Sequence, residues 1–361
     1  MKIHLLLASL AMLCSLTSQA TEQNLPKHWF GDDPKSKIVI DYADWDFVLR
    51  SSVMLSGPVN REKAKAEVPH TGTRLTNKYK TRTLLAGNKF HYEQFRKLPE
   101  LNDNVSAIRQ SLQQLPSEVA LNTLTATEQL AYWLNLYNLV VIDEINKIYP
   151  KKYLEEFVTA EGGLLQRKLL KIEGVELSLN DIQHKVLKVK FDHDPLVLYG
   201  LYQGYIGSPS IRKFAYTGEN VMRALQANAF DFINSNRGTY PAGDNFLVSS
   251  FYQRNADYFP NFQQDLRAHL NHYLKPAEKD ALQDADTMYA LIDDWIVTDI
   301  YGTRQEFGGG SSVNISNING DPYLSRFPPE LLKYLVKLQQ RNDEALGTVT
   351  VKDLEAQQSE N

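Results

Sequence analysis

The sequence predicts a helix-rich α+β fold, built as a single domain with a small sheet. One long segment, residues 125–150, repeats apolar side chains at helical spacing. Shorter apolar runs lie between turns rich in glycine and proline, as short buried strands do. The chain shows no internal repeat and no sustained heptads, which excludes a solenoid and a long coiled coil.

The composition is that of a globular protein. Of 361 residues, 43% are hydrophobic and 23% are charged, which excludes a mainly disordered chain. The formal net charge of −4 gives no basic footprint, so we expect no nucleic-acid partner. After the first twenty residues, no apolar run is long enough to cross a membrane.

Residues 1–20 are typical of a secretory signal peptide. Lys2 precedes an apolar run, and positions 18–20 read Ser-Gln-Ala, the small-residue pattern that a signal peptidase accepts. Cys14 suggests a lipoprotein site, but the bulky Leu13 before it disfavours this alternative. Because Cys14 is the only cysteine, we expect a soluble mature protein, periplasmic or secreted, that has no disulfides.

The segment 125–150 is the clearest predicted helix. Thr125 and Glu128 fit a capping box, and Pro150 closes the helix. Apolar residues on its opposite face indicate a buried helix, in which Asn135 and Asn138 need hydrogen-bond partners. One interpretation is a structural network that pins neighbouring loops, and the other is a direct role in binding or catalysis.

The next segments combine a helix, an apolar run and a loop. Ser178 is a plausible N-cap, with Asp181 three residues later, for a helix that extends to residue 187. The apolar run 196–202 predicts a buried strand. Glycines, a proline and small hydroxyl residues then predict an ordered loop over 203–220.

The remaining elements follow from apolar spacing. Helices are expected at 41–55, 219–233 and 262–283, and a short helical or turn element at 89–98. Residues 245–260 predict a short apolar strand or turn followed by the start of a helix. The domain is expected to span 40–302, with an apolar segment interrupted by paired acids at its end. Residues 303–361 predict a glycine-rich linker, a helix and a flexible polar tail.

Several segments, read in order, resemble the family called domain of unknown function 547. They are residues 131–142, 177–187, 196–217 and 247–259, with a weaker fifth match at 292–299. The resemblance implies a helix-rich α+β domain, found in many exported bacterial proteins and fused to other modules in plants. It implies no established activity.

The departures from the family pattern concentrate at chemically reactive positions. Typical members carry a histidine on the strand, a loop of the form Asn-Cys-x-x-x-x-Cys-Pro, and Ile-Glu-His on the helix. In this chain Leu198 is at the histidine position and Tyr202 at the asparagine position. Gln203 and Ser208 are at the two cysteine positions, and Gln183 is at the glutamate position. Ile206, Gly207 and Pro209 keep the frame of the loop. This pattern indicates a retained fold whose chemistry is lost or changed.

Ser208 and His184 are the catalytic candidates. Ser208 can replace the cysteine as a nucleophile if His184 acts as its base and Asp181 or Asp293 orients the imidazole. The alternatives are a structural loop serine and a hydrogen-bonded histidine. The binding candidates are neutral groups that donate or accept hydrogen bonds, namely Asn135, Asn138, Gln183, Gln203 and Tyr202.

No metal site and no cofactor are predicted. His269 and His272 are three residues apart but have no visible third ligand, so a solvated helix face is expected. The glycines at 308–310 lack the lysine of a phosphate-binding loop.

The sequence therefore predicts a non-catalytic binding or scaffold protein whose partner is an unidentified small molecule, peptide or protein. The alternative is a serine-type hydrolase of acyl or amide bonds that uses Ser208 and His184.

Overall fold

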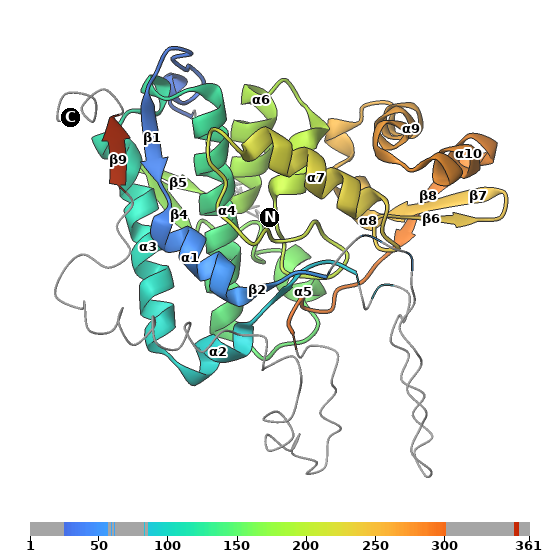
Figure 1. Cartoon of the computed structure of the whole chain (residues 1–361), viewed down its shortest axis with the longest axis horizontal. Helices are drawn as coiled ribbons and strands as arrows, with labels where there is room; N and C mark the ends of the chain where they lie inside the picture. Colours follow the sequence, from blue (N-terminus) through green and yellow to red (C-terminus); the bar gives the residue numbers. More distant parts are fainter. Residues whose placement is uncertain are drawn as a thin grey trace, which may run out of the picture.

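The computed structural model describes residues 25–56, 59, 61, 83, 86–300 and 350–353. It confirms the helix-rich α+β class: helices surround a buried central helix, and the sheets have two or three strands (Figure 1). The predicted signal peptide and most of the predicted C-terminal segment lie outside the described residues. No helix among the described residues is long and apolar enough to span a membrane.

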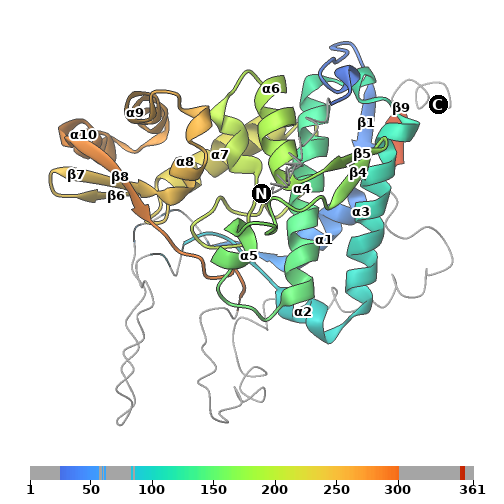
Figure 2. The ribbon, with the colours of Figure 1, turned by 180° about the vertical axis from the view of Figure 1, so that it is seen from behind.

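The centre of the fold is α4 (Ala126–Ile148), as predicted. Its N-cap is Thr125, whose hydroxyl accepts the Glu128 N–H at 3.2 Å. Every residue from Glu128 to Ile145 is buried, so α4 has no solvent face. Along it packs α3 (Glu100–Glu118), a helix that the sequence analysis did not assign (Figure 2).

Buried charges join α3 to α4. Arg109 on α3 forms ion pairs with Asp143 and, at 3.2 Å, with Glu144. Lys147 binds the same two carboxylates, and Arg167 binds Glu144 at 3.1 Å. The negative charges of these two buried carboxylates are therefore balanced by neighbouring cations.

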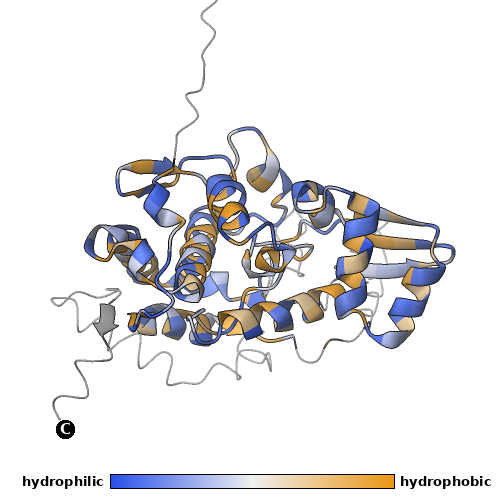
Figure 3. Ribbon diagram, turned by 90° about the horizontal axis from the view of Figure 1, so that it is seen from above, coloured by the Kyte–Doolittle hydropathy of each residue, from blue (hydrophilic) through white to orange (hydrophobic). Residues whose placement is uncertain are grey.

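The other helices are short, and most lie at or near the predicted positions. Figure 3 shows apolar and polar residues alternating along them. They are η1 (Lys27–Trp29), α1 (Ala43–Ser52), α2 (Tyr92–Lys97), η2 (Leu121–Thr123), α5 (Glu155–Thr159), the π-helical η3 (Asp181–Leu187) continuing into α6 (Lys188–Lys190), η4 (Pro195–Gly200), α7 (Val221–Ile233), α8 (Ser250–Arg254), η5 (Ala256–Tyr258), α9 (Phe262–Tyr273) and α10 (Pro276–Asp284).

The strands of the described residues form four small sheets. The largest has β6 (Thr239–Ala242) antiparallel to β7 (Asn245–Ser249), which pairs in parallel with β8 (Thr287–Ile292). The connection between β7 and β8 contains α8, η5, α9 and α10. The two-stranded antiparallel sheets are β1 (Ile38–Asp41) with β9 (Thr350–Asp353), β2 (Val53–Met54) with β3 (Lys89–Phe90), and β4 (Leu170–Ile172) with β5 (Val175–Leu177).

Two predicted elements differ from those in the structure. The predicted strand 196–202 is the 3-10 helix η4, because Asp194 accepts the Leu196 N–H at 2.8 Å and Pro195 occupies the first helical position. The predicted helix 262–283 is two helices, because Pro276 begins a new one.

Glu128 connects α4 to two distant segments. Its buried carboxylate accepts the N–H of Ile40 at 2.8 Å and that of Gly218 at 2.6 Å. The capping box is therefore only half formed, because the carboxylate does not return to Thr125. A Cβ at Gly218 would lie 2.0 Å from Glu128 Oε2, so any larger residue there would displace the Glu128 carboxylate. Burial raises the pKa of Glu128, and these two hydrogen bonds oppose the rise.

His269 lies in an aromatic cluster instead of on a solvated face. Its Nε2 is 2.8 Å from the Tyr199 hydroxyl, which is 3.0 Å from that of Tyr252. The rings of Tyr199 and His269 are stacked with centroids 5.6 Å apart. Burial lowers the pKa of His269 to about 4.

The low pKa of His269 predicts acid-sensitive stability. Below the normal histidine pKa of about 6.5, this histidine binds a proton in the unfolded chain but not in the folded chain. The stability of the fold therefore decreases as the pH is lowered from about 6.5 to about 4. Between pH 7.5 and 5.0 this group should remove about 2 kcal/mol from the free energy of unfolding. Urea unfolding of His269→Gln at both pH values should show a pH dependence smaller by that amount.

His272→Gln is the matched control, on the same helix. It should keep nearly the full pH dependence of the wild type, because the side chain of His272 is exposed to solvent. His91, whose pKa burial also lowers to about 4, contributes equally to all three proteins. Identical pH dependence of stability in the wild type and in His269→Gln would contradict a lowered pKa of His269.

Candidate functional site

Ser208 is completely buried, in the loop between η4 and α7. Its hydroxyl donates to the Tyr205 carbonyl at 2.8 Å, as in a structural loop serine. The backbone carbonyl of Ser208 accepts a hydrogen bond from the guanidinium of Arg237. The same guanidinium donates to the Ile206 carbonyl at 3.2 Å and to the Ser210 hydroxyl at 2.7 Å. The loop thus encloses a buried cation and holds Ser208 by hydrogen bonds to its backbone and side chain.

Two cations in this region, Arg237 and Lys89, are buried and form no ion pair with a described residue. Arg237 is 1% exposed and Lys89, which donates to the Ala86 carbonyl at 3.1 Å, is 7% exposed. Burial lowers the pKa of Arg237 to about 10 and that of Lys89 to about 8. The neighbouring Asp294 and Asp299 oppose the fall at Lys89.

His184 lies on η3 and is partly exposed. Its Nδ1 is 2.9 Å from Asp257, which also binds Lys188 at 2.6 Å. The two aspartates proposed to orient it bind elsewhere: Asp181 to Ser178, Lys168 and Lys185, and Asp293 to Ser250 and Arg254. The structure shows no hydrogen bond between His184 and Ser208, and it pairs the imidazole with an aspartate that the sequence analysis did not select.

Asn135 and Asn138 hold backbone groups of the loop that follows η4. Asn135 donates to the Tyr216 carbonyl at 2.8 Å and accepts the Tyr216 N–H at 3.0 Å. Asn138 donates to the Gly200 carbonyl at 2.9 Å and accepts the Tyr202 N–H at 2.9 Å. We call these two contacts the asparagine clamps. They match the interpretation in which both amides pin neighbouring loops.

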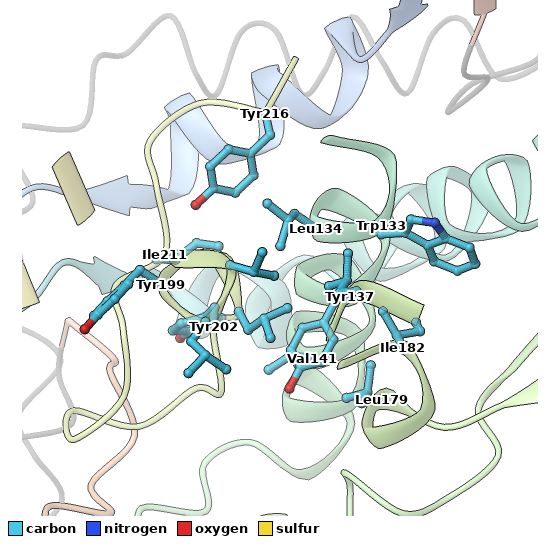
Figure 4. Close-up of a cluster of buried hydrophobic side chains, with 14 of the residues drawn as sticks. Trp133, Leu134, Tyr137, Val141, Leu179, Ile182, Tyr199, Tyr202, Ile211 and Tyr216 are labelled. Atoms are coloured by element: carbon cyan, nitrogen blue, oxygen red, sulfur yellow. The ribbon is translucent and has the colours of Figure 1, made fainter. Parts of the chain in front are cut away.

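Tyr202 is also buried. Its hydroxyl hydrogen-bonds with the Thr298 hydroxyl and, at 2.8 Å, with the Tyr92 hydroxyl. It therefore joins the loop to the start of α2 and to the segment after β8. Figure 4 shows Tyr202, Tyr137 and Val141 in the apolar cluster around α4.

Gln183 and Gln203 belong to a second group of polar side chains, which converge from four segments of the family resemblance. Gln183 donates to Asn255, just after α8, and its backbone carbonyl accepts from the Tyr258 hydroxyl at 2.8 Å. Gln203 accepts from the Tyr205 hydroxyl at 2.8 Å. We call this set of buried amides and phenols, with Tyr137 from α4, the amide–phenol cluster.

Arg254 and Trp295 cover the Tyr205 side of this cluster. The guanidinium donates to the Tyr205 hydroxyl at 2.5 Å and lies 4.5 Å from the Trp295 ring centroid. The centroids of the Tyr205 and Trp295 rings are 4.3 Å apart. Asp293 lies 3.7 Å from Arg254, so the cation is partly compensated.

Sequence reasoning did not select Tyr137, Arg254, Asn255 or Tyr258 as site residues. The available signal was their position inside the resemblance segments 131–142 and 247–259. The structure adds the contacts, since Asn255 and Tyr258 both bind Gln183.

The family comparison agrees with this arrangement. A model of the family described as "Protein of unknown function, DUF547" matches residues 121–233. These residues are therefore similar to the DUF547 family. The matched segment contains α4, η3, η4, α7 and the loop around Ser208, whereas Arg254 and Trp295 lie beyond it. No curated protein and no solved structure matches the chain.

The described part of the chain contains no group of three acidic, histidine or cysteine side chains arranged to hold a metal ion.

The asparagine clamps predict a large stability loss on truncation. Asn135→Ala and Asn138→Ala each leave two buried backbone groups unpaired, so each should lower the free energy of unfolding by about 2–3 kcal/mol in urea titrations. Asn146→Ala is the matched control on the same helix, because the amide of Asn146 has no hydrogen-bond partner among the described residues. It should cost less than about 1 kcal/mol. Equal losses at all three positions would contradict the clamp.

Proposed function

We propose that this protein is a non-catalytic binding protein that uses the DUF547 domain as a recognition scaffold. The observation that carries the proposal is the chemistry of the replaced positions. Where the resemblance implies two cysteines, a histidine and a glutamate, this chain has Gln203, Ser208, Leu198 and Gln183, all of them neutral.

The contacts of these residues support the proposal. An effective serine nucleophile needs a base within hydrogen-bond reach, whereas the Ser208 hydroxyl donates to a backbone carbonyl. Leu198 is completely buried among apolar residues. Gln183 and Gln203 are suited to hydrogen bonding and not to proton transfer.

A labelling experiment separates this function from the serine hydrolase. The purified protein should show no covalent labelling by a broad fluorophosphonate probe, because no base activates Ser208. A bona fide serine hydrolase treated in parallel controls for the reactivity of the probe. Labelling that disappears in both Ser208→Ala and His184→Gln would overturn the non-catalytic function and support the hydrolase, with the paired His184 and Asp257 as its base and orienting acid.

We also propose that the protein is exported and acts in the periplasm or outside the cell. The signal-like residues 1–20 support this location. Expression of the full chain in a bacterial host should yield a product that begins at Thr21 and is released with the periplasmic fraction, as measured by N-terminal sequencing after osmotic shock. Ala20→Arg is the control variant, and it should block cleavage because it removes the small residue at the cut. Retention of Met1 in a cytosolic product of the unchanged chain would contradict export.

A further inference from the structure

Strand β1 pairs along one edge with a short segment from near the end of the chain. This segment, β9, lies antiparallel to β1, in the register that sets Val351 opposite Ile40 and Lys352 opposite Val39. Figure 1 shows β9 beside β1 at the periphery of the molecule. Among the described strands, β9 pairs with β1 alone, and residues 301–349 connect it to the domain.

The opposite edge of β1 is held by the domain itself. The Ile40 N–H donates to the Glu128 carboxylate on α4 at 2.8 Å, and the Ile38 N–H donates to the Ser36 hydroxyl at 3.2 Å. The side chain of Ile40 belongs to the hydrophobic core and is 4% exposed. The position of β1 therefore depends on α4 and the core, and not on β9.

The edge of β1 that faces β9 carries the backbone groups of Val39 and Asp41. Consecutive residues of a strand direct their N–H and C=O groups to opposite edges. Because the N–H groups of Ile38 and Ile40 point toward the domain, those of Val39 and Asp41 point toward β9. Lys352, the register partner of Val39, is therefore at a hydrogen-bonded position of this pair.

The pairing between β1 and β9 is short enough to be exchanged. Each strand has four residues, and a pair of strands alone is only marginally stable in water. An extended segment of another protein can form the same main-chain hydrogen bonds, which depend little on its sequence. Opposite Ile40, an apolar β-branched residue such as Val351 favours the pairing.

We propose that the outer edge of β1 is a docking site for an extended peptide segment of a partner protein, and that β9 occupies this site when the partner is absent. The partner segment lies antiparallel to β1, with an apolar β-branched residue opposite Ile40. Main-chain hydrogen bonds supply the affinity, and alternate side-chain positions supply the specificity. This inference rests on the proposed binding function and names the class of partner.

Two proline variants of the full chain provide the test. Lys352→Pro removes an N–H that faces β1, so it should release β9 and open the edge. Val351→Pro is the matched control, because the N–H at this position faces away from β1 and an edge strand tolerates proline there. In nuclear magnetic resonance titrations, a synthetic peptide of residues 347–354 should bind Lys352→Pro at least about tenfold more tightly than the wild type or Val351→Pro, in which β9 competes.

The amide protons of Val39 and Asp41 locate the bound peptide. In Lys352→Pro they should exchange rapidly with solvent, and they should become protected when the peptide is added. The same peptide with proline at the position of Lys352 should not bind. Thr350→Pro is a second variant with the same expected behaviour, because Thr350 is the register partner of Asp41.

Equal peptide binding by the wild type and both kinds of proline variant, or binding that leaves Val39 and Asp41 unprotected, would overturn the proposal. A dimer of the unchanged chain in sedimentation velocity that Lys352→Pro abolishes would also overturn it, because β9 of a second copy would then be the occupant. Fluorophosphonate labelling of Ser208 would instead overturn the non-catalytic function, whatever the peptide result.

Discussion

The structure depends on how a completely buried helix satisfies its polar side chains. Between Glu128 and Ile145, α4 has no face toward solvent, so the polar groups on it depend on partners inside the protein. Glu128, Asn135 and Asn138 find these partners in backbone amides and carbonyls of segments far away in the sequence. The core helix thereby fixes the strand β1 and both ends of the loop around Ser208.

Sequence reasoning could predict this helix and its pinned loops because the signals are local. The cap at Thr125 and the all-round apolar pattern are visible in one segment, and a buried amide requires partners wherever they come from. The same reasoning failed at η4, since a short apolar run does not distinguish a buried strand from a buried helical turn. It also missed α3, although Leu101, Val105 and Leu112 lie at helical spacing.

The candidate site could be predicted only in part. The family resemblance directs attention to Gln183, Gln203 and Ser208, but partner choice depends on three-dimensional contacts. The relay from Arg254 through Tyr205 to Gln203 links residues that are about fifty positions apart, and no sequence spacing encodes it. The contacts of Ser208 give it a structural role in the loop, because its hydroxyl donates to the Tyr205 carbonyl.

Native-state hydrogen exchange tests the central role of α4 most directly. The N–H groups of Tyr202 and Tyr216 donate to Asn138 and Asn135 at 2.9 and 3.0 Å, although both residues lie in a loop. The clamps predict that these two amides exchange only through global unfolding, with the same free energy as the backbone amides in the middle of α4. Exchange of Tyr202 and Tyr216 through local opening, at a free energy several kcal/mol lower, would contradict the account.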